Sequence, residues 1–160
     1  MLDAPLEFRR SDGAGEQGGF TISTDRAKLD LEVVHAFLVN SYWAKGIPRS
    51  VLERAIENSI CFGIYADHTQ VGFARVVTDL ATYGYLADVF VIEPYRGRGL
   101  SKWLVECVLA HPDLQGLRRL SLFTRDAAGL YERFGFAPSR STATYLEISK
   151  PNVYAERAPR

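Results

Sequence analysis

The sequence is poor in cysteine and has no surplus of charge of either sign. Only 2 of its 160 residues are cysteine, too few for the disulfide framework of a small secreted domain. Lys plus Arg and Asp plus Glu each number 19, so the formal net charge is zero. Because a dedicated nucleic-acid binder normally carries a basic surplus, we expect no nucleic-acid partner.

Long hydrophobic runs are also missing. Charged residues interrupt every apolar stretch well before the ~18 residues that a membrane span needs, so we expect no membrane segment. Residues 1–5 lack the basic region and apolar core that begin a secretory signal. Cys61 and Cys107 lie in apolar patterns that predict two buried thiols, and we expect a reducing, cytoplasmic location. The three histidines have no metal-ligand spacing, so no metal site is expected.

What the sequence does contain fits one globular domain. Apolar residues make up 47% and charged residues 24% of the chain, close to the globular average. Residues 1–18 are polar and glycine-rich and predict a loose N-terminal arm. Residues 19–149 carry the apolar patterns of the domain, and residues 150–160 form a polar tail.

Hydrophobic periodicity predicts alternating strands and helices. The predicted strands cover 20–23, 60–65, 71–77, 82–92, 119–124 and 142–148, and the predicted helices cover 27–43, 48–58, 99–110 and 127–134. Asp126 is a candidate N-cap of the last helix and Gly135 a candidate C′ residue. Strands 82–92 and 119–124 flank a helix and should be parallel, while the short links elsewhere favour antiparallel pairs. We therefore expect an α/β (α+β) domain with a mixed, mostly antiparallel sheet.

The loop Arg96-Gly97-Arg98-Gly99 lies between an apolar strand and a helix start. The first amides of a helix lack intrahelical acceptors and attract anions, and glycine lets the backbone approach a phosphate closely. Arginine adds charge and forked donors. Lys102 stands where a dinucleotide fingerprint needs a small residue, and no Walker sequence is present. A phosphate site is one interpretation, and a tight turn with two solvated arginines is the other.

Two segments of the sequence resemble the GNAT superfamily of N-acetyltransferases. Arg96-x-x-Gly99-x-Ser101 resembles the family's Gln/Arg-x-x-Gly-x-Gly/Ala signature, with serine as a small departure at its last position. The segment 130–136, Leu-Tyr-Glu-Arg-Phe-Gly-Phe, resembles a second family element. The order of predicted elements from about 20 to 148 also agrees. The resemblance implies a GNAT fold, with its parallel strand pair splayed apart and helices on both faces of the sheet.

The resemblance also implies transfer of an acetyl group from acetyl-CoA to a primary amine, directly within a ternary complex. The pantetheine arm would lie in the gap between the two parallel strands, and no metal is implied. The residues expected to contact the coenzyme are Val89, Phe90, Val91, Arg96, Gly97, Arg98, Gly99, Leu100, Ser101, Thr124, Asp126 and Leu130.

Two residues are candidates for the chemistry. Tyr131 matches the family tyrosine that protonates the departing thiolate, and its neutral phenol can donate at neutral pH. As an alternative, Tyr131 only packs on the apolar face of its helix. Asp88 is the single charge in an apolar run, and a carboxylate there needs a partner or a cleft. It could take the proton of the amine, bind a cationic acceptor, or pair with Arg75 of the neighbouring strand.

The acceptor pocket is expected near the end of the first helix. Tyr42 and Trp43 could stack on a flat or cationic acceptor or pack in the core, and Arg75 completes the expected substrate-binding set. A small-molecule amine is favoured over a protein acceptor because the sequence shows no strongly basic or acidic face that would bind a large partner. Many members of the family pair as homodimers. The alternative to an enzyme is a non-catalytic acyl-CoA sensor, which the presence of Tyr131 and Asp88 disfavours.

Overall fold

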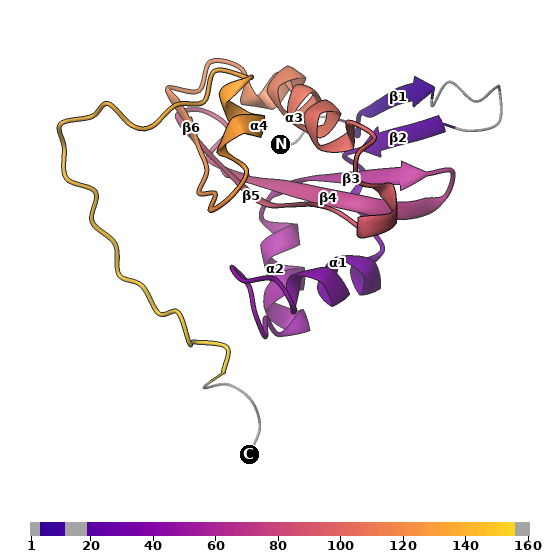
Figure 1. Ribbon diagram of the computed structural model, residues 1–160, viewed down its shortest axis with the longest axis horizontal. Coiled ribbons are helices and arrows are strands. Elements are labelled where there is room, and N and C mark those ends of the chain that lie inside the picture. The colour runs from indigo at the N-terminus through magenta and orange to yellow at the C-terminus, as the bar shows by residue number, and fades with distance from the viewer. Residues whose placement is uncertain (1–3, 12–18, 156–160) are drawn as a thin grey trace.

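The computed structural model describes residues 4–11 and 19–155 and consists of one mixed sheet covered by helices (Figure 1). Within these residues the strands are β1 (Glu7–Ser11), β2 (Gly19–Ser23), β3 (Ile60–Ala66), β4 (Thr69–Thr78), β5 (Tyr83–Val91) and β6 (Arg119–Ser121). The α-helices are α1 (Leu31–Leu38), α2 (Arg49–Glu57), α3 (Leu100–Ala110) and α4 (Ala128–Glu132), with short 3₁₀ turns at Arg26–Lys28, Glu93–Tyr95 and Pro112–Leu114.

The strands lie in the sheet in chain order, from β1 to β6. Neighbouring strands are antiparallel except β5 and β6, which are parallel. This confirms the mixed, mostly antiparallel sheet with one parallel pair. Within the described residues, no helix is long and apolar enough to span a bilayer, and no group of three His, Cys, Asp or Glu side chains could hold a metal ion.

Each face of the sheet carries its own hydrophobic cluster, because alternate side chains of a strand point to opposite faces. On one face α3 and α4 pack over residues such as Phe62, Ile64 and Val76. On the other face α1 and α2 pack over Cys61, Phe73 and others. Figure 1 shows the two helical layers above and below the sheet. Helices cover both faces, as the resemblance implied.

The first strand corrects the prediction of a loose arm over the described part of residues 1–18; the prediction for residues 1–3 and 12–18 lies outside the described residues. Glu7–Ser11 pairs along its whole length with β2, from Glu7 opposite Ser23 to Ser11 opposite Gly19. The segment contains one large apolar residue, Phe8, which packs against the α3-side cluster. A polar edge strand of this kind is stabilised by its ladder of backbone hydrogen bonds, and its sequence therefore gives little strand signal.

The first predicted helix, 27–43, is too long at both ends. Asp30 caps α1 by accepting hydrogen bonds from the amides of Glu32 and Val33, at 3.0 and 3.3 Å. The helix ends near Val39, and a turn follows in which Gly46 donates its amide hydrogen to the Val39 carbonyl. Tyr42 and Trp43 of this turn are almost half exposed, while Ala44 and Ile47 pack against the cluster below the sheet, so apolar spacing alone could not show where the helix ends.

The chain after β6 departs most from the prediction. The predicted N-cap Asp126 is wrong: the hydroxyl of Thr124 accepts the amide hydrogen of Ala127 at 3.0 Å instead. Gly135 does adopt the left-handed conformation of a C′ residue, with φ of 88°. The predicted strand 142–148 is also wrong, because these residues pair with no strand in the described chain. The other predicted helices and strands agree with the structure within about three residues.

Candidate active site

The loop that joins β5 to α3 forms a row of unused backbone donors. Gly97 and Gly99 have φ of 76° and 72°, in the left-handed region that favours glycine. Gly99 is the N-cap of the 11-residue helix α3 and has no side chain to cap it. In the described chain, no group accepts a hydrogen bond from the amides of residues 97–102. Gly97 and residues 99–102 are among those that line a small cavity of about 220 Å³, and a cavity at a helix N-terminus with free amides suits a phosphate group.

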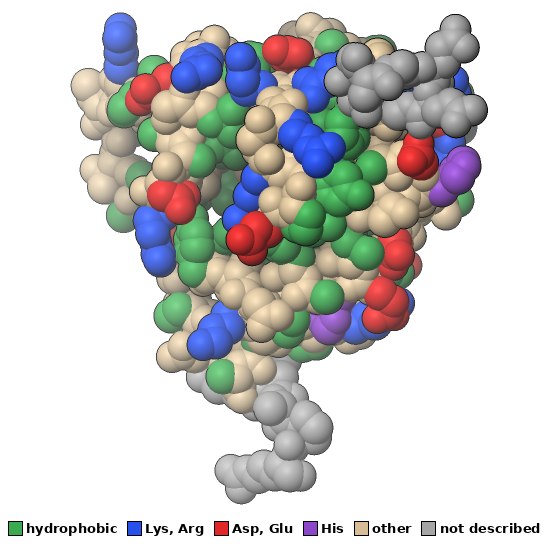
Figure 2. Space-filling view, turned by 45° about the vertical axis from the view of Figure 1, so that its right-hand side comes forward, with side chains coloured by type: hydrophobic (Ala, Val, Ile, Leu, Met, Phe, Trp, Pro, Cys, Tyr) green, Lys and Arg blue, Asp and Glu red, His purple; other side chains and the backbone are tan. Residues whose placement is uncertain are grey.

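Basic side chains surround this cavity. Arg96, Gly97, Gly99, Ser101 and Lys102 are among the residues that line it. The Nε of Arg96 donates to the Val91 carbonyl at 2.9 Å, which ties the loop to the end of β5. In Figure 2, which turns the β1–β2 side of the molecule toward the viewer, Lys and Arg side chains gather on the upper part of this face. The net charge of the chain is zero, so the positive potential here is local.

Arg10 of β1 also holds the loop, and the sequence analysis did not identify it. Its guanidinium donates to the carbonyls of Arg98 and Gly99, at 2.7 and 3.3 Å, and lies 5.0 Å from the Trp103 ring centroid. These hydrogen bonds involve only carbonyl oxygens of the loop, so the backbone amides of the loop remain available to bind a ligand. Arg10 is 88 residues away from Arg98 along the chain, and no local pattern could have revealed the contact.

The strands β5 and β6 separate after a short paired stretch. Their register covers only Tyr83 to Tyr85 of β5 against β6. Beyond Tyr85, β5 continues to Val91 beside β4, and the structure describes no strand along its other edge. Backbone groups on such an edge remain free to pair with the amides of a ligand. The splayed parallel pair is thus present next to the glycine loop.

Asp88 lies at an irregularity in this strand. The pairing of β4 with β5 shifts between Phe73 and Arg75, and Asp88 adopts a φ of 56°, which is unusual for a residue other than glycine. A bulge with a left-handed residue bends a strand and increases its twist. The bulge therefore turns β5 just before Val89, Phe90 and Val91, the residues expected along the coenzyme.

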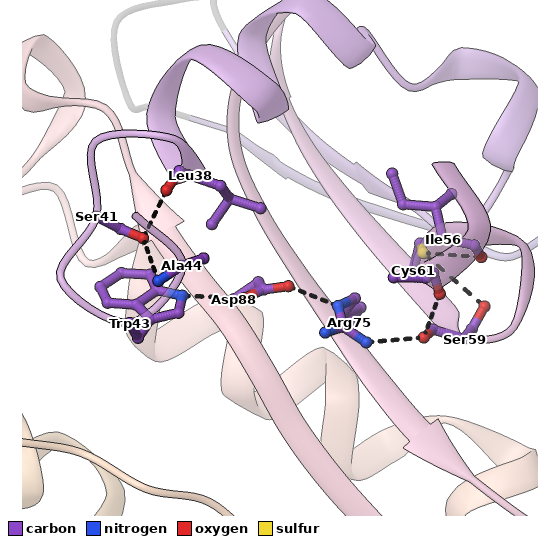
Figure 3. Close-up of polar contacts among 10 residues, drawn as sticks. Leu38, Ser41, Trp43, Ala44, Ile56, Ser59, Cys61, Arg75 and Asp88 are labelled. Carbon is purple, nitrogen blue, oxygen red and sulfur yellow. Dashed lines mark hydrogen bonds and ion pairs between the residues drawn. The ribbon is translucent and has the colours of Figure 1, made fainter. Parts of the chain in front are cut away.

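The carboxylate of Asp88 is buried, and each of its oxygens accepts a hydrogen bond (Figure 3). Oδ2 accepts from Nε of Arg75 at 2.5 Å, and Oδ1 accepts from Nε1 of Trp43 at 2.9 Å. Arg75 also donates from Nη1 to the hydroxyl of Ser59 at 3.2 Å. The predicted pairing of Asp88 with Arg75 is confirmed. Three of the predicted site residues thus form one connected network across β4, β5 and the turn after α1.

Tyr131 lies on the buried face of α4, and its ring packs against Phe136 with centroids 5.8 Å apart. Burial, with smaller contributions from the nearby Tyr42 and Asp126, raises the pKa of its phenol to about 12. No hydrogen bond joins its hydroxyl to another described residue. The phenol therefore keeps its proton at neutral pH and is free to donate it.

Tyr42 connects the turn after α1 with the loop before α4. Its hydroxyl accepts the amide hydrogen of Arg125 at 3.3 Å, and the Arg125 guanidinium lies 4.0 Å from its ring centroid. Tyr42 and Trp43 make an edge-to-face contact at 4.9 Å, yet both rings are almost half exposed. The predicted pair of aromatic residues thus lies beside Asp88 and borders the same region as Tyr131.

The remaining predicted coenzyme contacts divide into two groups. Phe90, Val91 and Leu100 bury their side chains in the two clusters and offer only backbone groups to a ligand. Phe90, for example, stacks on Phe37 at 3.9 Å. Val89, Leu130 and Thr124 are half-buried, and Asp126 is exposed and caps no helix. That these positions contact the coenzyme stays a prediction, and the structure shows which of them could do so only through backbone groups.

Comparison with known proteins agrees with this geometry. A model of the acetyltransferase (GNAT) domain matches residues 57–138. A protein of Gibberella zeae whose name describes it as an acetyltransferase is 32% identical over 138 residues, covering 72% of this chain and 77% of the relative. A crystal structure from Xanthomonas campestris pv. campestris, described as a member of the GNAT family, is 50% identical with a TM-score of 0.82, covering 85% of this chain and 96% of the other. A structure from Clostridium acetobutylicum with acetyl-CoA shares the fold at 11% identity, with a TM-score of 0.54 and 91% and 96% coverage.

Proposed function

Because the chain belongs to the GNAT family of acetyltransferases, we propose that it transfers the acetyl group of acetyl-CoA directly to a primary amine of a small molecule. The observation that supports this most is the row of free amides from residue 97 to 102, at the start of α3 and next to the open edge of β5. A diphosphate fits the row of free amides, and an extended arm that contains amides fits the open edge of β5.

The residues of this chain divide the binding of acetyl-CoA between them. The amides of residues 97–102 would hold the pyrophosphate, with the guanidinium of Arg98 and the amine of Lys102 adding charge. The free backbone edge of β5 near Phe90 and Val91 would pair with the pantetheine amides. Acetyl-CoA itself supplies an acyl group activated as a thioester.

Transfer requires a neutral amine, a polarised carbonyl and a protonated leaving group. A backbone N–H of β5 near Phe90 or Val91 would polarise the thioester carbonyl. As the amine forms the new C–N bond and the C–S bond breaks, the Tyr131 hydroxyl would give its proton to the departing sulfur. The surplus proton of the acetylated nitrogen passes to water, and the phenolate regains a proton from solvent, so the charges balance.

Asp88 acts here as a positioning residue. Its oxygens accept one hydrogen bond from Arg75 and one from Trp43, and these two bonds hold the carboxylate in place. The carboxylate fixes the bulge from which the β5 amides point and holds Trp43 at the edge of the acceptor region. A direct role as general base remains a prediction, which the pH profile discussed below tests.

The acceptor would lie against the exposed rings of Tyr42 and Trp43. Aromatic faces bind flat or cationic groups, and the nearby Arg125 adds a donor for an anionic substituent.

The structure describes two free, buried cysteines, which suit a reducing cytoplasm.

The test is an acetyl-CoA consumption screen across classes of amine, with the Tyr131→Phe variant alongside. We expect at least one class of small amine to be acetylated, and Tyr131→Phe to lower turnover about 100-fold while calorimetry shows unchanged acetyl-CoA binding. Tyr145→Phe is the matched control, because Tyr145 is 66% exposed, and it should retain full turnover. Tight binding of acetyl-CoA without turnover of any amine would instead favour an acyl-CoA sensor.

A further inference from the structure

β1 lies at the edge of the sheet (Figure 1) and supplies one arginine that contacts the glycine loop. Successive side chains of a strand point to opposite faces. Arg10 is directed toward the loop, and its guanidinium donates to the carbonyl oxygens of Arg98 and Gly99, at 2.7 and 3.3 Å. Arg9 points to the other face, where its side chain is 81% exposed and takes part in an ion pair within β1. Of these two neighbouring arginines, Arg10 is thus the one that contacts the loop.

Holding these two carbonyl groups also orients two amides. A peptide unit is planar and trans, so its C=O and N–H bonds point in opposite directions. The Arg98 carbonyl shares a peptide unit with the Gly99 amide, and the Gly99 carbonyl shares one with the Leu100 amide. Both carbonyls are turned toward Arg10, so both amides point away from it. Gly99 and Leu100 are among the residues that line the cavity of about 220 Å³.

The loop benefits from such an anchor because glycine restrains it little. Gly97 and Gly99 both have positive φ, and glycine adopts either sign of φ readily, so the peptide units beside it rotate at low cost. Arg96 fixes the start of the loop through its hydrogen bond to the Val91 carbonyl at 2.9 Å, and Arg10 fixes the end. A site that is held in its binding conformation before the ligand arrives loses less entropy on binding and therefore has the higher affinity.

A contact from the neighbouring strand supports the same side of the loop. Phe20 of β2 is the cross-strand partner of Arg10, so both side chains lie on the same face of the sheet. Phe20 meets Tyr95 edge to face at 6.3 Å, and the Arg98 guanidinium lies 5.2 Å from the centroid of the Tyr95 ring. These contacts use side chains and carbonyl oxygens only. β1 and β2 therefore hold the loop without using the backbone donors that a diphosphate needs.

We propose that Arg10 is a positioning residue for the acyl donor: it holds the amides of Gly99 and Leu100 in the direction that binds the diphosphate of acetyl-CoA. This role rests on the proposed function, which assigns the loop to that diphosphate. Arg10 acts through the two carbonyl oxygens and not by touching the ligand. It therefore raises the affinity for donors that carry a diphosphate, and it leaves the affinity for a donor with only the pantetheine arm unchanged.

Calorimetry with acetyl-CoA on the variant Arg10→Met tests this role. Methionine keeps an apolar stem beside Trp103 but cannot donate to the carbonyls, and we expect the dissociation constant to rise about tenfold, which corresponds to one net hydrogen bond. Arg9→Met is the matched control, because it removes the same charge from the same strand, and it should keep the native affinity. Arg10→Lys keeps the charge but not the forked donor, and it should recover only part of the loss. Full recovery would assign the effect to charge and overturn the positioning role.

A truncated donor separates positioning from a general effect on the fold. Acetyl-pantetheine has the thioester and the amides of the arm but no diphosphate. Its dissociation constant, measured by NMR titration, should agree within about twofold between the native chain and Arg10→Met. Weaker binding of both donors, or unchanged acetyl-CoA binding in Arg10→Met, would overturn the positioning role alone. A native chain that does not bind acetyl-CoA would refute the proposed function and the positioning role together.

Discussion

The carboxylate of Asp88 connects Arg75 and Trp43, so replacing it by an amide should destabilise the fold. Asp88→Asn leaves the Arg75 guanidinium without a counter-charge in a site where its side chain is 18% exposed. Removing one partner of a buried pair costs about 3 kcal/mol, and urea denaturation should show a loss of about this size. The matched change Glu53→Gln acts on an exposed pair with Arg49 and should cost less than about 0.5 kcal/mol. An equal decrease in the free energy of unfolding for the two variants would mean that the buried network stabilises the fold no more than an exposed ion pair does.

The same variant separates the two roles discussed for Asp88. If Asp88 positions the β5 bulge and Trp43, Asp88→Asn should lower turnover while the acidic limb of the pH–rate profile stays at the same pH. If Asp88 is the general base, that limb should disappear, because the titrating group is gone. The comparison is made at saturating acetyl-CoA, so that changes in coenzyme binding do not mask the effect.

The two cysteines should be inert in the native protein. Burial raises the pKa of both Cys61 and Cys107 to about 12, from 9.0, and only the thiolate reacts. A thiol reagent at about pH 8 should therefore label neither residue until denaturant is added, when both react. Because unfolded thiols ionise at lower pH than these, the stability that they contribute is complete below about pH 9 and declines as the pH rises toward 12. Rapid labelling of the folded protein would show that a thiol is accessible.

At the scale of elements, the proposed function assigns pyrophosphate binding to the turn into α3. Gly99 has φ of 72°, and a β-branched residue cannot adopt this conformation without strain. Gly99→Val should therefore distort the row of amides and abolish acetyl-CoA binding in calorimetry. Gly99→Asn is the control, because asparagine visits the left-handed region readily, and it should keep affinity within about tenfold. Unchanged affinity in Gly99→Val would count against a pyrophosphate site in this loop.

The accuracy of the sequence-based prediction also varies by element. The strands and helices around the glycine loop were predictable because their apolar periodicity is long and unbroken, as in β5 and α3. β1 was missed because backbone hydrogen bonds to β2 stabilise this edge strand, so its sequence shows no clear apolar alternation. The end of α1 depends on tertiary packing, and the start of α4 on the hydrogen bond from the Ala127 amide to Thr124, neither of which periodicity reports. The segment 142–148 has strand chemistry but no strand beside it in the described chain.

Within the candidate site, the sequence predicted the pairing of Asp88 with Arg75 but not the backbone geometry that holds the residues. Asp88 stood out as a lone charge in an apolar run, and its pairing with Arg75 followed from the expected strand pair. The left-handed conformation of Asp88 and the contact of Arg10 with the loop could not be predicted. Both arise from register and from pairing between segments far apart in the sequence, which a single sequence does not specify.

At the scale of the whole molecule, the two hydrophobic clusters share the same strands, so they should unfold together. The chain has one tryptophan on each side of the sheet. Trp103 of α3 packs against the hydrophobic cluster that α3 and α4 cover, and Trp43 contacts Phe37 of the cluster that α1 and α2 cover. Phenylalanine at either position leaves a single reporter. We expect Trp43→Phe and Trp103→Phe each to show one urea transition by fluorescence that coincides with its own transition by circular dichroism.

Acetyl-CoA provides the second part of this prediction. A ligand present at 100 times its dissociation constant stabilises the native state by about 2.7 kcal/mol. If the domain unfolds as one cooperative unit, its free energy of unfolding rises by this full amount whichever tryptophan reports it. The transitions of both single-tryptophan proteins should therefore move to higher urea by the same free energy, although the glycine loop lies on the α3 side. A shift seen only by Trp103 would show that the two layers unfold separately and that the bulge network of Asp88 does not couple them.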